Sequence, residues 1–306
     1  MSEQHPPSGS QDINMPGIAT ATTVTPIRTF KYEGLSHFTA LVRKCLSTDI
    51  QILEFCEVSA DDFDILSSDE ARPLKSAKFS YNFSTGILQV RMPHSAHETV
   101  TGLFRSLIDK ELFSMRVEKE VYCQSSPLTE IGVWAKEPDA CWIPDDIDEP
   151  SVVLEVGASE STPHLATSAR GWIEAAGSSV MACIAINISP ANDLVIDVWK
   201  KGERTYGMTL RNAHVPAIRQ QHIEIKNDLS DPEVHGWRVN EDSSVVPADE
   251  ILLEFPLLVG RPAHNDWEHD VLLDRSVLIE LATRFLRKQS RRAEGRRARD
   301  EPPSVF

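Results

Sequence analysis

Residues 151–157 read SVVLEVG, and this short run decides the fold class. A continuous apolar run of this length that ends at a glycine is typical of a strand buried on both faces. Glu155 interrupts the run, and an unpaired charge in such a position is costly. The sequence therefore predicts a buried strand over residues 151–156 and makes Glu155 a candidate site residue.

The residues that follow predict a helix and two more strands. Thr162-Pro163 is a typical N-cap with proline at the first helical position. The expected helix ends near Gly177, and its apolar side chains recur at helical spacing at Leu165, Ala169, Trp172, Ile173 and Ala176. Residues 180–188 are again apolar, and residues 194–199 alternate after a Ser-Pro-Ala-Asn turn. We expect these two strands to form a hairpin.

The residues before position 151 add a hairpin, a helix and two strands. The strand-like stretches 78–83 and 86–92 are joined by Ser-Thr-Gly, which is a hairpin signal. A helix is expected from Ser95, since Ser95 and Glu98 have the S-x-x-E spacing of a capping box. Its apolar stripe consists of Val100, Leu103, Phe104, Leu107 and Ile108. Further strands are expected near residues 117–124 and 128–134.

Both ends of the chain differ from this central part. Residues 1–25 are rich in Ser, Pro, Gln and Thr, so we expect a disordered tail. Residues 26–265 are predicted to form a single globular domain, with its core at about 92–200 and short strands and loops at 204–254. Residues 266–306 are predicted to form a C-terminal helix, over 266–288, and a basic tail. The ambiguous stretch before residue 75 has helical spacing at 38–45 and a possible strand at 52–58.

The order of these elements, helix, strands, strand, helix, strand and strand, predicts an α/β or α+β sheet with helices packed against it. Composition narrows the function. The net charge of −15 disfavours a chain that coats nucleic acid or anionic membrane over its whole surface. No window approaches the roughly 18 apolar residues of a membrane span. The N-terminus has no secretory pattern and the five scattered cysteines form no CxxC pair, so we expect an intracellular, cytoplasmic or nuclear protein.

Two carboxylates in this core suggest metal chemistry. Asp139 follows Pro138 shortly before the strand that carries Glu155. A hard divalent cation such as Mg²⁺ binds oxygen ligands and keeps several waters, so two carboxylates on rigid elements suffice to hold it. Such an ion lowers the pKa of a bound water and stabilises charge on a phosphate. A nearby cationic side chain usually helps to position or deprotonate that water.

At these residues the chain resembles the PD-(D/E)XK nuclease superfamily, and more narrowly the Uma2-type branch and its relatives in fungi. The resemblance extends over residues 92–199 and is weaker at Arg261-Pro262 and in the C-terminal helix. Its pieces are Met92-Pro93 with His97-Glu98, Pro138-Asp139-Ala140, the run from Glu155 to Ser161, a Trp-containing helix ending at Gly177, and an apolar strand.

The resemblance implies a restriction-endonuclease-like core with a mixed, mostly antiparallel sheet, elaborated by N-terminal strands and a C-terminal helix. It also implies a Mg²⁺ or Mn²⁺ ion held by Asp139 and Glu155, with the Val156 carbonyl as a further ligand. The family's lysine is missing, because position 157 is Gly. The Uma2-type branch takes its cation from the following helix, and the candidates here are Arg170 and Lys136. An arginine stays protonated, so it binds phosphate or orients water but does not act as a base.

Several residues have alternative interpretations. Glu98 is either a further site carboxylate or the capping-box residue, which we favour. His97 lies beside the apolar stripe and is interpreted as a packing residue rather than a ligand. An aspartate after proline is most often a turn residue, which is the alternative for Asp139. Glu160 is interpreted as a solvated charge or as part of the next helix N-terminus.

The basic tail, which contains Arg291, Arg292, Arg296 and Arg297, has two interpretations. It binds nucleic-acid phosphates or serves as a nuclear address, or it is a solvated helix end whose cations complement the helix dipole. Two functions remain open for the chain. One is a Mg²⁺-dependent phosphodiesterase of nuclease type, and the other is a catalytically inactive descendant of the same fold that acts as a binding or scaffold protein.

Overall fold

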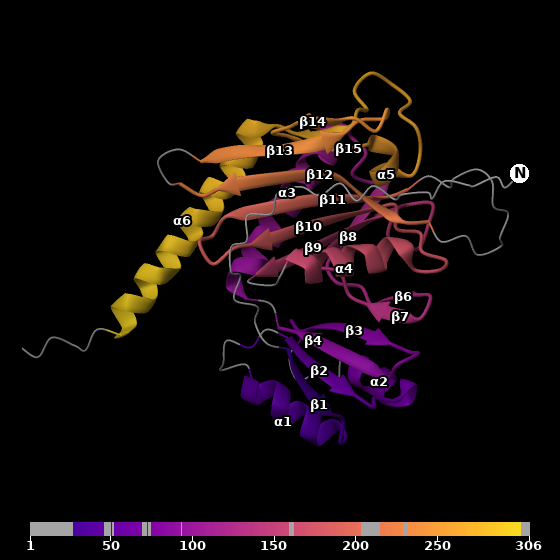
Figure 1. Ribbon diagram of the computed structural model, residues 1–306. Coiled ribbons are helices and arrows are strands. Elements are labelled where there is room, and N and C mark those ends of the chain that lie inside the picture. The colour runs from indigo at the N-terminus through magenta and orange to yellow at the C-terminus, as the bar shows by residue number, and fades with distance from the viewer. Residues whose placement is uncertain are drawn as a thin grey trace, which may run out of the picture.

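A computed structural model describes residues 27–45, 50, 52–68, 72, 75–92, 94–158, 162–202, 215–228 and 232–300. These residues form two large sheets, a small two-stranded sheet and the helices around them (Figure 1). The predicted tail at 1–25 and Glu160 lie outside the described residues.

The first sheet has six strands in the order β1-β2-β4-β3-β7-β6. Its strands are β1 Arg28–Lys31, β2 Ile52–Cys56, β3 Lys78–Asn82, β4 Ile87–Arg91, β6 Thr129–Ile131 and β7 Trp134–Lys136. β1 pairs with β2 in parallel, and the other neighbours pair antiparallel. Helices α1 Leu35–Cys45 and α2 Ala60–Ser67 contribute Phe38, Val42, Phe63 and Leu66 to its aromatic-rich core.

The second sheet has eight strands in the order β14-β13-β12-β11-β10-β9-β8-β5. Its strands are β5 Val121–Gln124, β8 Ala140–Pro144, β9 Val152–Ala158, β10 Ala182–Ile188, β11 Leu194–Lys201, β12 Ala217–Lys226, β13 Glu233–Val239 and β14 Val245–Pro247. β9 and β10 pair in parallel. The other neighbouring pairs in this sheet are antiparallel.

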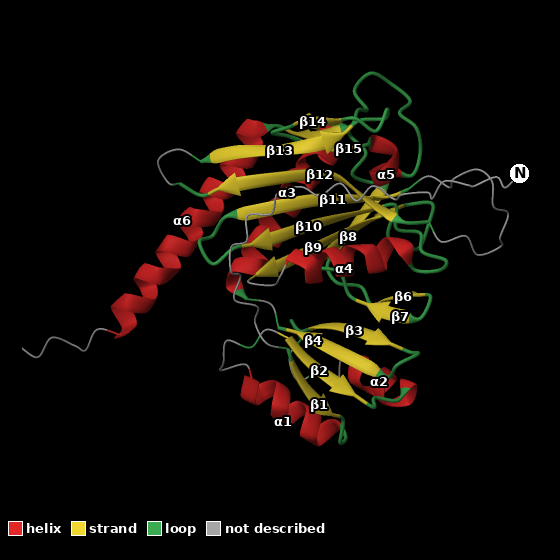
Figure 2. Cartoon of the chain, in the orientation of Figure 1, coloured by secondary structure: helices red, strands yellow, loops and turns green. Residues whose placement is uncertain are grey.

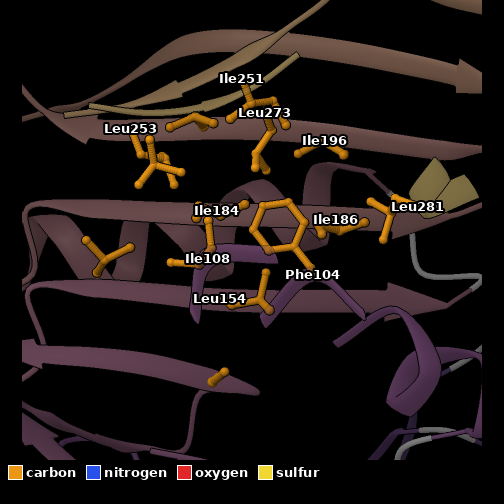
Figure 3. Packing of buried hydrophobic residues seen from close by; sticks show 14 of the residues in the cluster. Phe104, Ile108, Leu154, Ile184, Ile186, Ile196, Ile251, Leu253, Leu273 and Leu281 are labelled. Atoms are coloured by element: carbon orange, nitrogen blue, oxygen red, sulfur yellow. The ribbon is translucent and has the colours of Figure 1, made fainter. Parts of the chain in front are cut away.

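Helices cover both faces of the second sheet (Figure 2). They are α3 Ser95–Ser114, α4 Thr162–Glu174, α5 Phe255–Val259 and α6 Arg275–Asp300, and the small sheet pairs β15 Ile251–Leu253 with β16 Val271–Leu273. Phe104 and Ile108 of α3 pack with Leu154 and Ile184 on one face (Figure 3). Val153 belongs to the other core, with α4, because successive strand residues point to opposite faces.

The chain passes from the first sheet to the second in three residues. β7 ends at Lys136, and β8 begins at Ala140. Residues 137–139 therefore lie at the junction of the two sheets, so a side chain there can be reached from both. This connection positions the site described below.

The fold class agrees with the sequence analysis: mixed sheets, mostly antiparallel, are flanked by helices, with N-terminal strands and a C-terminal helix added. Both predicted hairpins, β3–β4 and β10–β11, are confirmed. Each large sheet has a hydrophobic cluster of its own. The division of the chain into a tail, one domain over 26–265 and a C-terminal segment stays a prediction.

Three local predictions were wrong. The expected strand at 128–134 is the hairpin β6–β7, which turns at Gly132 with a φ of +57° that glycine adopts without strain. The expected helix at 266–288 contains β16 and begins only at Arg275, because the Asp274 side chain accepts a hydrogen bond from the Val277 N–H at 2.9 Å and caps it there. The stretch 204–254, expected to hold short strands, includes the ten-residue β12.

The capping box is a fourth local prediction that was wrong. Helix α3 begins at Ser95 itself, and His94 is the N-cap residue, with no side-chain cap hydrogen bond. Ser95 lies inside the first turn and Glu98 one position further along than a capping box requires. Glu98 is therefore not held at the cap, and its position has to be explained by other contacts.

Candidate active site

Asp139 is fixed between the two sheets by the backbone of β9. Its own N–H donates to the Leu154 carbonyl at 2.9 Å, and its Oδ2 accepts the Val156 N–H at 2.7 Å. The Asp139 side chain is fully buried. It therefore extends the ladder between β8 and β9 by one side-chain hydrogen bond, which explains its fixed orientation.

Glu155 lies on the face of β9 that α4 covers. Its Oε1 accepts a hydrogen bond from Trp172 Nε1 at 2.5 Å, and its side chain is 1 % exposed. Trp172 is fully buried in the core beneath α4. The predicted buried strand thus carries its charge toward a helix that supplies a matching donor.

Arg91 joins the two carboxylates. Its Nη1 donates to Glu155 Oε2 at 2.8 Å, and its Nη2 lies 3.4 Å from Asp139 Oδ1. Arg91 is the last residue of β4, on the polar side of a strand whose other face is buried in the first core. Arg91 was not predicted to be a site residue, although its alternation with the buried Val90 places it on the opposite face of β4.

His97 was interpreted as a packing residue, and its contacts show more than that. It is buried in α3, and its Nε2 lies 3.0 Å from Asp139 Oδ2. Burial opposes its protonated form, but the Asp139 carboxylate, with a smaller contribution from Glu98, outweighs burial and raises the pKa of His97 to about 9. His97 is therefore a cationic partner of Asp139 at neutral pH.

Lys136 approaches Glu155 from β7. Its Nζ donates to the Ser168 carbonyl at 3.2 Å and to Ser168 Oγ at 3.1 Å, and it lies 4.8 Å from the centre of the Trp172 ring. Burial lowers the pKa of Lys136, against the opposing effect of Glu155. Lys136 and Glu155 thus line the same cavity, close enough for the carboxylate to favour the charged form of the amine.

Arg170 and Glu98 lie away from the two carboxylates. The Arg170 Nε pairs with Glu174 Oε1 at 2.9 Å, one helical turn along α4, and its side chain is 53 % exposed. Glu98 is half-exposed and lies 3.7 Å from His97 Nδ1, on the far side of that ring from Asp139. The neighbouring His97 lowers the pKa of Glu98, and the charge of Lys78 adds to this effect.

A cavity of about 340 Å³ lies between the two sheets beside Glu155. Lys78, Gln89 and Arg91 reach it from the first sheet, while His164 and Ser168 reach it from α4. The three side chains from the first sheet lie on the face of β3 and β4 that is turned away from the first core. The cavity gives a ligand access to Arg91 and Glu155, whereas Asp139 lies behind them.

The oxygen atoms around Asp139 and Glu155 can be matched to the ligands that a divalent ion needs. Among the described residues, no group of three or more His, Cys, Asp and Glu side chains is arranged to hold a metal ion. Mg²⁺ needs fewer, since it is commonly bound by one or two carboxylates plus waters. The N–H and C=O of a strand residue point to the same edge, so the Val156 carbonyl faces the same side as its N–H, toward Asp139. Two carboxylates and a carbonyl fit a hard cation.

Cationic side chains of the protein neutralise the two carboxylates in this structure. Burial opposes ionisation of Asp139, but the Arg91 and His97 charges hold the pKa of Asp139 well below its usual range. Asp139 and Glu155 are therefore balanced by protein cations. The guanidinium of Arg91 lies between them.

The basic tail is a continuation of α6, which projects beyond the second sheet (Figure 1). Arg292 donates to the Ser95 carbonyl at 2.6 Å and to Thr99 Oγ1 at 3.1 Å, so it fastens α6 to the start of α3. Arg291 is exposed, and the side chains of Arg296 and Arg297 lie outside the description. In the part of the chain that the structure describes, no helix is both long and apolar enough to cross a membrane.

Comparison with known proteins gives a likeness to solved structures alone. No family model and no curated protein matches the chain. A crystal structure of a nuclease candidate belonging to DUF820 from Anabaena variabilis is similar over 52 % of this chain and 94 % of its own, with a TM-score of 0.34 and 12 % sequence identity. A likeness of this size assigns no activity, so the function of this chain has to be argued from its own residues.

Proposed function

We propose that this chain is a phosphodiesterase of nuclease type that depends on Mg²⁺ or Mn²⁺. The observation that carries the proposal is the convergence of two buried carboxylates, Asp139 and Glu155, on one cation at the edge of a cavity. Two buried carboxylates that share one cation contribute little to stability, because the cost of desolvating the charges offsets much of the attraction between the carboxylates and the cation. Such pairs are therefore candidates for a functional site.

The roles follow from the contacts. Asp139, Glu155 and the Val156 carbonyl would hold the ion, which when bound lowers the pKa of a water and stabilises charge on a phosphate. Trp172 and the backbone of β9 keep the carboxylates oriented. We assign the assisting cation to Lys136, because it is buried beside Glu155 and its pKa is lowered toward the range where an amine exchanges protons.

The cavity suggests the class of substrate. Lys78, Arg91, Lys136 and His164 line it, together with Glu155, which is paired with Arg91, and Glu137, which is paired with Arg72. The two lysines in a chain of net charge −15 favour an anionic ligand at this place rather than over the whole surface. The phosphodiester backbone of DNA or RNA fits that description. The exposed Arg291 on α6 is a second place where phosphates would bind.

The test is cleavage of DNA and RNA with Mg²⁺, with Mn²⁺, and with a chelator. We expect metal-dependent cleavage that Asp139→Asn and Glu155→Gln each abolish. Lys136→Met should lower the rate on the order of 100-fold, as expected for a group that assists proton transfer. Arg170→Met is its matched control from the exposed face of α4 and should change the rate less than about threefold. Unchanged cleavage in both carboxylate variants would overturn the proposed site.

The second candidate is an inactive descendant that binds nucleic acid or another partner without cleaving it. The observation that favours it is Arg91, which already neutralises both carboxylates. This candidate predicts oligonucleotide binding that is the same with and without divalent ions, and no cleavage by the wild type. Binding measured in a chelator, beside the cleavage assay, separates the two functions.

A further inference from the structure

We infer that Arg91 is an internal counter-cation that occupies the metal position and sets the affinity of the site for divalent ions. The inference rests on the proposed metal site at Asp139 and Glu155, but it concerns a residue of the other sheet. Its consequence is that a divalent ion and the Arg91 guanidinium exclude each other. The ion binds only when Arg91 has withdrawn.

The geometry supports mutual exclusion. One guanidinium contacts both carboxylates, with its two terminal nitrogens 2.8 Å from Glu155 Oε2 and 3.4 Å from Asp139 Oδ1. The remaining oxygens, Asp139 Oδ2 and Glu155 Oε1, accept hydrogen bonds from Val156 N–H and Trp172 Nε1. The oxygens that face each other across the site are thus the ones that Arg91 takes. A shared metal ion needs those same two atoms.

Charge adds to the exclusion. An arginine stays protonated at any working pH, so Arg91 cannot leave the site by losing its charge. A divalent ion beside a guanidinium, with both buried between two carboxylates, would repel it at short range in a region of low dielectric. Displacement of the side chain is the remaining route.

The position of Arg91 makes that displacement feasible. It is the last residue of β4, its side chain is 16 % exposed, and it lines the cavity between the sheets. Rotation about its side-chain bonds moves the charge into the cavity, where an anionic ligand can compensate it, and leaves the carboxylates in place. Asp139 and Glu155 are held by the backbone and by Trp172, so they do not have to move.

The consequence can be expressed as a population. If Arg91 is withdrawn in a minor fraction of molecules, the apparent affinity for metal is reduced by that fraction. Minor states of this kind are commonly populated at about 0.1–10 %. Removing the guanidinium should therefore tighten metal binding on the order of 10- to 1,000-fold.

The experiment is a Mn²⁺ titration of the full chain without substrate, in which free Mn²⁺ is followed by electron paramagnetic resonance. We compare wild type, Arg91→Gln and Arg91→Lys. Arg91→Gln should bind one Mn²⁺ per chain at least about tenfold more tightly than the wild type. Arg91→Lys keeps the charge but loses the two-pronged contact, so its affinity should lie between them. Adding Asp139→Asn to Arg91→Gln should remove the gained binding.

The matched control is Arg72→Gln. Arg72 also forms a buried ion pair with a carboxylate, Glu137, next to the first sheet, but it contacts neither Asp139 nor Glu155. It should leave the Mn²⁺ affinity as in the wild type. Circular dichroism checks that each variant is folded, and Arg91→Lys provides the comparison if Arg91→Gln does not fold.

The outcomes separate the inference from the proposed function. Folded Arg91 variants that bind Mn²⁺ no more tightly than the wild type overturn the inference, and so does a gain of equal size in Arg72→Gln. Tight binding gained in Arg91→Gln, with no cleavage by any variant, supports Arg91 as the internal cation and overturns the nuclease function. If the wild type cleaves nucleic acid and already binds Mn²⁺ as tightly as Arg91→Gln, the nuclease function is supported and the inference on Arg91 is overturned.

Discussion

Two arginines in this protein each bridge two carboxylates, in different surroundings. Arg91 joins Asp139 and Glu155 at the junction of the large sheets. Arg261, just after α5, donates to Glu120 at 2.7 and 2.8 Å and to Glu268 at 2.7 and 3.1 Å. By hydrogen-bond geometry the Arg261 cluster is the better formed of the two.

Burial and access distinguish the clusters. Asp139 and Glu155 are both almost completely buried, whereas in the Arg261 cluster Glu268 is 6 % exposed and Glu120 is 42 % exposed. None of the three members of the Arg261 cluster lines the cavity between the sheets, but Arg91 and Glu155 both do. The comparison teaches that the same pattern of charges occurs in two settings. Of the two clusters, the one at Arg91 combines two buried carboxylates with a neighbouring cavity, which makes it the better candidate for a site.

The largest effect on the free energy of unfolding is expected when the arginine of each cluster is replaced in turn. Arg91→Met should lower the free energy of unfolding by about 3–5 kcal/mol in the absence of divalent ions, because it leaves two buried carboxylates without their cation. Arg261→Met should cost only about 1 kcal/mol, since solvent screens its exposed partner. Urea unfolding of both variants measures the difference. Equal losses would contradict the distinction drawn from burial.

The second prediction uses pH. Since the pKa of His97 is raised to about 9 from an ordinary 6.5, its pairing with Asp139 stabilises the fold fully below pH 6.5. This contribution is lost as the pH rises through 9. It amounts to on the order of 3 kcal/mol. In a chelator, the wild type should lose this stability between pH 6.5 and 9, and His97→Gln should not. Parallel pH profiles for both proteins would show that His97 is not charged by Asp139.

A smaller effect comes from the neutral donor to Glu155. Trp172→Phe keeps most of the buried ring but removes the N–H that Glu155 Oε1 accepts. The cost should be about 1–3 kcal/mol, as for a buried carboxylate oxygen left without its donor. Trp267→Phe is the control, because that ring is 59 % exposed, and it should change stability by less than about 0.5 kcal/mol. Thermal unfolding of Trp172→Phe and Trp267→Phe, each compared with the wild type, measures the two costs.

The smallest effect is expected at a third arginine. Arg170 pairs only with Glu174 among the contacts found for it, on an exposed helix face. Arg170→Ala should change the free energy of unfolding by less than about 0.5 kcal/mol, the usual range for a surface pair one helical turn apart. A loss of several kcal/mol in chemical denaturation would mean that Arg170 reaches the buried cluster after all.

Much of the fold followed from local pattern. The apolar run around Leu154, the helical stripe of α3 and the two hairpins were predicted because side-chain spacing reports which face of an element is buried. Boundaries that depend on capping were predicted less well. His94 rather than Ser95 is the N-cap of α3, and Asp274 delays the start of α6, since several polar residues compete for each cap.

The candidate site divides in the same way. Glu155 was found in the sequence because it places a charge inside a buried strand, and Asp139 because Pro138-Asp139-Ala140 before that strand resembles a known family pattern. Arg91 was not found, because it lies 48 residues from Asp139 and 64 from Glu155, and nothing in its local pattern names a partner in another sheet. His97 was misjudged for the same reason: its apolar surroundings were visible, but the carboxylate opposite it was not.

The sequence by itself determined most of the strands and helices, a glutamate inside a buried strand, and an aspartate shortly before that strand. The tertiary structure decided which cations meet them: Arg91 and His97 directly and Lys136 beside Glu155, with Arg170 turned to the surface. The physical reason is that periodicity encodes the face of each element, whereas ion pairing depends on how faces far apart in the chain come together. The missing lysine at Gly157 is therefore only part of the question, since the charge between Asp139 and Glu155 comes from the other sheet.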